Sequence, residues 1–167
     1  PAPTMQQTPK TPEEAAAEAA DYKIGMIIEQ EQTPEATRDK LLLLFPNFTP
    51  VEKVAAAPHI VNLTGDEDLP RMLPFLKNPL TPPEAMESFF NDMLNRPPEL
   101  GWPVLVDLIG TPRHPMAERA KEIMTTIVGE DHGNDVTKWM DGLRAQLEQQ
   151  GLELPPAVGA PGTAPQP

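Results

Sequence analysis

Apolar residues recur along the chain at the three- and four-residue spacing of an amphipathic α-helix. In the clearest case, a single face at a period of 3.6 residues carries Met116, Ala120, Ile123, Met124, Ile127 and Val128. No segment shows a sustained alternation of apolar and polar residues, and the connections between the helical segments are too short to contain strands. The pattern therefore predicts an all-α protein.

The boundaries of the helices are predicted from their start and stop residues. We expect helices at about 12–31, 34–45, 50–57, 69–77, 82–95, 99–110, 115–129 and 135–150. Pro46 should end the second helix, and Pro58 should interrupt the third, because proline lacks the N–H that a helix interior needs. Gly129 and Gly151 stand where glycines commonly terminate helices.

Thr-Pro pairs precede five of the helical segments, at Thr11-Pro12, Thr33-Pro34, Thr49-Pro50, Thr81-Pro82 and Thr111-Pro112. A threonine at the N-cap accepts a hydrogen bond from a free backbone N–H, and a proline at the next position loses no donor that the helix needs. Glu14, Glu52 and Glu84 each follow a threonine by three residues, as in a capping box. The pairs thus predict helix starts, with proline-directed phosphorylation as the alternative interpretation.

The helical segments also repeat. With an offset of 33, Pro70, Leu73, Phe75, Leu76 and Pro79 align with Pro103, Val106, Leu108, Ile109 and Pro112. With an offset of 34, Met86, Phe89, Phe90, Met93 and Leu94 align with Ala120, Ile123, Met124, Ile127 and Val128. A weaker copy lies 32 residues upstream of the first. We interpret the copies as three helix–turn–helix units, the smallest number that such stacks usually need. An irregular helical bundle is the alternative.

The repeated pattern, Leu-Pro-x-x-Leu-x-x-Leu followed by a proline-containing turn and an amphipathic helix, resembles a divergent HEAT-type α-solenoid repeat. It is clearest in residues 69–94 and 102–128, and the resemblance covers about residues 37–129. It implies a short α-solenoid of about three antiparallel helix pairs, with flanking N- and C-terminal helices. It also implies a groove that binds another protein without catalysis.

Proline content differs between the ends and the middle of the chain. Of 23 prolines in 167 residues, three lie in residues 1–10 and five in residues 153–167. Segments of this composition cannot bury enough apolar surface to fold, so we expect disordered tails at 1–10 and 153–167 around one helical domain at 11–152. A polyproline ligand is the alternative for the C-terminal tail. Because the chain starts at Pro1, we expect a processed or truncated form, and we leave its compartment open, with export or anchoring through an upstream segment included.

Charge and cysteine content exclude several classes of protein. The net charge is -12, which disfavours a nucleic-acid partner because a polyphosphate repels a net anion. Cysteine is absent, so no disulfide framework or thiolate metal site is possible. No apolar run approaches the ~20 residues that a membrane-spanning helix needs.

Residues that could carry chemistry are few. Ser88 is the only serine and stands in no glycine elbow, and the three histidines are scattered singly, with His114 expected to cap or line a turn. The loop 129–135 could surround a hard cation, although Asn134 or Asp135 is better explained as the cap of the last helix. We therefore expect no enzyme, no cofactor, no metal site and no small-molecule substrate.

A non-catalytic protein–protein interaction module, as an adaptor or scaffold, is the function that these features favour. Trp102 and Trp139 are the candidate partner-binding residues, because tryptophan is enriched at binding hot spots, and a core position is the alternative for each. The second hypothesis is an acidic helical chaperone or assembly factor, whose flexible methionines accommodate varied clients. A carboxylate-dependent hydrolase is the third. The partner and the oligomeric state are not predicted.

Overall fold

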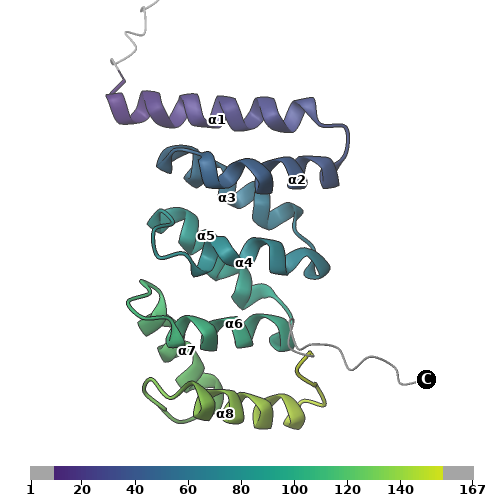
Figure 1. Ribbon diagram of the computed structural model, residues 1–167, viewed down its shortest axis with the longest axis vertical. Helices are drawn as coiled ribbons and strands as arrows, with labels where there is room; N and C mark the ends of the chain where they lie inside the picture. The colour runs from purple at the N-terminus through teal and green to yellow at the C-terminus, as the bar shows by residue number, and fades with distance from the viewer. Residues whose placement is uncertain (1–9, 156–167) are drawn as a thin grey trace, which may run out of the picture. The chain divides into compact units, whose positions relative to one another are not determined.

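The computed structural model describes residues 10–155, and within them the chain is helical, with no strand. Two short 3-10 turns, η1 (Phe45–Asn47) and η2 (Asp66–Asp68), interrupt the run of α-helices (Figure 1). The eight α-helices of this range are α1 (Pro12–Gln30), α2 (Pro34–Leu44), α3 (Pro50–Leu63), α4 (Leu69–Lys77), α5 (Pro83–Asn95), α6 (Pro98–Gly110), α7 (Ala117–Val128) and α8 (Val136–Gln149). The all-α prediction is confirmed, and the helices pack against their neighbours.

The chain divides into two compact units, residues 1–90 and 91–167, and the division falls inside α5. We call them unit 1 and unit 2 and describe each by itself. The domain boundaries expected at residues 11 and 152 stay predictions. Residues 1–9 and 156–167 of the expected tails lie outside the described residues.

Three Thr-Pro pairs start helices as predicted. The hydroxyls of Thr11 and Thr49 accept hydrogen bonds from the backbone N–H groups of Glu14 and Glu52, whose carboxylates accept from the threonine N–H groups in return. Both capping boxes are therefore formed. Thr33 caps α2 in the simpler way, because its hydroxyl accepts from the third helical residue at 3.1 Å.

The other two pairs do not start helices, and those predictions were wrong. α5 begins at the second of two consecutive prolines, so Thr81 is one residue too far away to be the N-cap, and its buried hydroxyl donates to the Phe75 carbonyl at 2.6 Å. Thr111 instead ends α6, and its hydroxyl donates to the Asp107 carbonyl at 2.8 Å. The next helix starts only after Pro115.

α3 also differs from the prediction, because it continues through Pro58 to Leu63. An interior proline removes one helical hydrogen bond and can cost about 3 kcal/mol. Pro58 lies on the exposed side of α3, where water can hydrate the unpaired carbonyl, whereas the Ile60 side chain is fully buried. Burial of a side chain of that size is worth about 1.5–3 kcal/mol, which offsets much of the cost.

In unit 1, α1, α2 and α3 pack against one another. Lys23 in the middle of α1 pairs with Glu52 at the start of α3, and Ile28 near the end of α1 lines the same cleft as Leu63 at the end of α3. α1 and α3 therefore run in the same direction. α2 runs opposite to both (Figure 1). It starts beside that cleft and is followed by Phe48, whose ring lies 5.3 Å from the Lys23 ammonium.

Phenylalanine rings fill the core of unit 1 beyond the end of α2. Phe45 lies at the centre, with ring centroids 4.5 Å from Phe75 of α4, 5.5 Å from Phe89 of α5 and 6.5 Å from Phe48. Tilted and edge-on aromatic pairs in this distance range are favourable beyond the apolar area that they bury. The rings thus connect three helical segments that are distant in the sequence.

In unit 2, α6 packs against α7 and α8, and Trp139 is the largest buried side chain. The Trp139 indole N–H donates to the Gly133 carbonyl at 2.9 Å, which fixes the loop before α8 onto the core. Asp135 caps α8 and Gly129 ends α7 with a φ of 88°, both as predicted.

Two glycines offer a direct test of these assignments, since a Cβ at either position would meet no atom within 4 Å. Gly25 lies inside α1, so Gly25→Ala should raise the free energy of unfolding by up to about 1 kcal/mol through helix propensity.

Gly129 has a left-handed backbone, so Gly129→Ala should lower the free energy of unfolding by about 1 kcal/mol. Urea denaturation followed by circular dichroism measures both. Gly129→Asn is the control and should cost less, because asparagine tolerates this conformation; equal signs for Gly25→Ala and Gly129→Ala would contradict the assignment.

Candidate functional site

A cleft of about 320 Å³ opens in unit 1 where α1 ends and α2 begins. The last residues of α1 and the turn, the first residues of α2, and the C-terminal part of α3 all contribute to it. Its lining residues are Ile28, Glu31, Gln32, Thr33, Pro34, Thr37, His59, Asn62 and Leu63. Concave sites with an apolar lining and a few polar groups are the usual form of binding sites, so this cleft is the candidate functional site.

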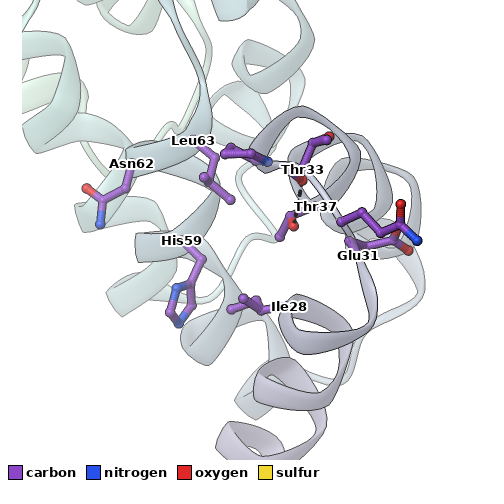
Figure 2. Close-up of a pocket in the computed structure, with 9 residues that line it drawn as sticks. Ile28, Glu31, Thr33, Thr37, His59, Asn62 and Leu63 are labelled. Atoms are coloured by element: carbon purple, nitrogen blue, oxygen red, sulfur yellow. Dashed lines mark hydrogen bonds between the residues drawn. The ribbon is translucent and has the colours of Figure 1, made fainter.

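The cleft has an apolar floor between two more polar walls. Figure 2 shows His59 and Asn62 of α3 on one side, Thr33 and Thr37 on the other, and Ile28 between them. His59 and Asn62, together with the apolar Leu63, are three and four residues apart, which places all three on one face of α3. This face exists as a wall only because α3 continues beyond Pro58.

Hydrogen bonds hold the α2 wall in place. The Thr33 carbonyl accepts from both the backbone N–H and the hydroxyl of Thr37, each at 3.0 Å. The Thr33 hydroxyl accepts from the Ala36 N–H at 3.1 Å. Since these groups are engaged within the first turn of α2 and Thr37 is buried, the wall is rigid and offers few donors to a ligand.

The electrostatic character of the cleft comes from the end of α1. Glu31 is the residue at which α1 ends, and the last turn of α1 contains no basic residue. A helix C-terminus carries partial negative charge on its unpaired carbonyls, so it adds to the charge of the Glu31 carboxylate. The opposite partial charge at the start of α2 is compensated by the Thr33 cap and by Glu35 in the first turn.

An ion pair holds α1 against α3 at a distance from the cleft. The Lys23 ammonium lies 2.7 Å from one carboxylate oxygen of Glu52, and the other oxygen accepts from the Thr49 N–H at 2.9 Å. The hydrogen bond from Lys23, followed by that from Thr49, holds the pKa of Glu52 below its ordinary value. We call this arrangement the α1–α3 clamp.

A second group of charges connects α2 to η2 and α4. Arg38 pairs with Asp68 at 2.6 Å and with Asp39 at 3.0 Å, and Arg71 pairs with Asp39 at 2.7 Å and with Asp68 at 3.3 Å. Hydrogen bonds from Arg71 and then from Arg38 lower the pKa of Asp39. Both carboxylates are partners of arginines from other parts of unit 1, which suits a structural role.

The structure places neither predicted tryptophan at the cleft. Trp139 has no exposed surface and Trp102 is partly buried, both within unit 2. Burial of Trp139 matches the core alternative, and partner binding by either residue stays a prediction. His114 lines a turn as expected, because its Nδ1 accepts from the Met116 N–H at 3.1 Å.

The sequence marked Thr33 and Pro34 as a helix start but marked no residue of the cleft as a candidate for binding. Its lining comes from segments about 30 residues apart, and no local motif marks it. The three- and four-residue spacing of His59, Asn62 and Leu63 could have indicated a shared helix face. The third helix was predicted to end at residue 57, so these residues were not assigned to a helix. No set of three or more acidic or histidine residues in the range 10–155 could hold a metal ion. Likewise, no helix in that range is long and apolar enough to cross a bilayer.

Comparisons of the chain with models of protein families, with curated proteins and with solved structures find no match. The roles assigned to residues of this site therefore rest on geometry and charge.

The two functions of Glu52 in the α1–α3 clamp can be separated. Glu52→Gln keeps the reach-back of a capping box but loses the ion pair, and should lower the free energy of unfolding at pH 7 by about 0.5 kcal/mol. Glu52→Ala loses both and should cost about 1 kcal/mol more. Urea denaturation at pH 7 measures both values.

The pH dependence provides a second measurement. Because the pKa of Glu52 is lowered in the folded state, its stabilising effect is complete above the ordinary value of 4.5 and is lost as the pH falls through the folded-state pKa. The difference between wild type and Glu52→Gln should therefore shrink below pH 4.5. A difference that grows on acidification would contradict the clamp.

Proposed function

We propose that this protein is a non-catalytic module that binds another protein, and that the cleft in unit 1 is a contact site. The cleft is the observation that carries the proposal. It combines an apolar floor, formed by Ile28, Pro34 and Leu63, with polar groups at the rim, which is the composition of a surface that takes a side chain from a partner.

The arrangement of the helices supports a repeat protein of the HEAT-type class. The helix pairs that pack most extensively are all one or two positions apart along the chain. Contacts restricted to near neighbours are typical of solenoids. Several aligned positions of the sequence copies are buried in both copies, namely Met72 and Leu105, Leu76 and Ile109, Met86 and Ala120, and Phe90 and Met124. Other aligned pairs differ, since Phe89 is buried and Ile123 is partly buried.

The titratable groups support a role without catalysis. The pKa values of Asp39 and Glu52 are lowered from their ordinary values, and that of Arg71 is raised. Each of these groups belongs to an ion pair between two helical segments, and none of them lines the cleft. Shifted pKa values at catalytic sites usually accompany groups that face a cavity.

The chaperone alternative gains no specific support. Met72, Met86, Met93 and Met124 are buried, and the other methionines of the range 10–155 are partly buried. A surface of exposed, flexible methionines, on which that hypothesis depends, is not observed in this range.

Filling the cleft tests the proposal. Asn62 is exposed at the cleft wall, so Asn62→Trp should cover the apolar floor with little effect on stability. A library of random dodecapeptides is selected on the full chain, and the affinities of the enriched peptides are measured by fluorescence anisotropy. We expect Asn62→Trp to weaken binding by about ten-fold or more.

Asn62→Ala is the matched control and should bind the peptides within about two-fold of wild type, because it leaves the floor open. Thermal unfolding of all three proteins verifies that they are folded. Failure to enrich any peptide, or equal binding by Asn62→Trp, would refute the cleft as a contact site.

A further inference from the structure

We infer that the cleft binds a lysine or arginine side chain of the partner protein, an inference that rests on the proposed function. The floor of the cleft would cover the methylene stem of that side chain, and the end of α1 would receive its charged head. Lysine and arginine commonly divide in this way, with the stem along an apolar surface and the head in a polar environment.

The shape of the cleft provides for the stem. Ile28 and Leu63 contribute an apolar surface between the α3 wall and the α2 wall (Figure 2), and Pro34 also lines the cleft. A strip of this kind suits an unbranched chain of methylenes. The strip ends at the turn that carries Glu31.

The charges favour a cation at that end. Among the lining residues, Glu31 is the carboxylate, and none is lysine or arginine. The C-terminus of α1 adds its partial negative charge, since no basic residue in the last turn neutralises it. Within residues 10–155, Glu31 takes part in no ion pair, so its charge is available to a partner.

Two cations of unit 1 are already engaged with carboxylates other than Glu31. Lys23 pairs with Glu52 at the other end of the three-helix set, and Arg38 pairs with Asp68 and Asp39. His59, on the α3 wall, is the other titratable residue that lines the cleft. The net charge of -12 also attracts a basic partner and repels a second copy of this chain.

The experiment uses peptides enriched from the random dodecapeptide library on the full chain. Each lysine and arginine of an enriched peptide is replaced in turn by norleucine, which keeps the methylene stem and removes the charge. Binding is measured by fluorescence anisotropy for wild type, Glu31→Gln, Glu31→Lys and Glu29→Gln. Glu29 belongs to the same last turn of α1 but does not line the cleft, so Glu29→Gln controls for the change in net charge.

We expect the enriched peptides to share a basic residue whose replacement by norleucine weakens binding. Glu31→Gln should weaken binding by about three-fold, as for a partly exposed ion pair, and Glu31→Lys by about ten-fold or more. With the norleucine peptide, wild type and Glu31→Gln should bind equally. Glu29→Gln should remain within about two-fold of wild type.

Other outcomes separate the two proposals. Peptides that bind the cleft and lose affinity with Asn62→Trp, but that need no basic residue and do not respond to Glu31→Lys, would overturn this inference and leave the proposed function in place. Peptides that are insensitive to Asn62→Trp, or an absence of enriched peptides, would overturn both.

Discussion

Proline has no backbone N–H. Most of the helix-associated prolines of this chain lie at helix starts, where a backbone N–H would have no partner within the helix. α1, α2, α3, α5 and α6 all begin at a proline. The first N–H groups of a helix lack partners in any case, so proline at this position costs no hydrogen bond and supplies a helical φ. Three of these starts also have a threonine cap. Helices as short as 9–19 residues are marginal in isolation, so defined ends and neighbours to pack against are what stabilise them.

Prolines inside helices follow a different rule, which depends on burial. Pro58, Pro74 and Pro103 are each tolerated within a helix, and Pro58 and Pro74 lie on exposed surface. A carbonyl that loses its helical partner on an exposed face can be hydrated, so the remaining cost is conformational. Ile60 follows Pro58 and Leu76 follows Pro74, and both are fully buried. The helix continues because its next turn is anchored in the core.

The dependence on burial explains which features of the fold could be predicted from the sequence. The presence of the helices could be predicted from apolar spacing and capping residues, which are local properties of the sequence. Thr81 does not cap α5 because that helix begins at the second of two consecutive prolines. Thr111 does not start a helix because it ends α6. The end of α3 was missed because the burial of Ile60 is a tertiary fact that no local rule contains. The cleft was missed for the same reason, since two of its walls become adjacent only when α1 and α3 run side by side. The tryptophans were predicted as binding residues from their residue type alone, and Trp139 instead occupies a core position.

The cleft and the α1–α3 clamp occupy different ends of the same pair of parallel helices, and this division has a physical consequence. Lys23 and Glu52 fix the spacing of α1 and α3 at one end, and each of these two packed helices carries a fully buried isoleucine, Ile24 or Ile60. None of these four residues lines the cleft. The α1 floor and the α3 wall are therefore held together by interactions that a ligand does not disturb. Occupation of the cleft would then require little reorganisation of these two helices, and little binding energy would be lost to ordering. The ion pairs divide in the same way: the Glu52 carboxylate accepts hydrogen bonds from Lys23 and Thr49, while Glu31 takes part in no ion pair within residues 10–155.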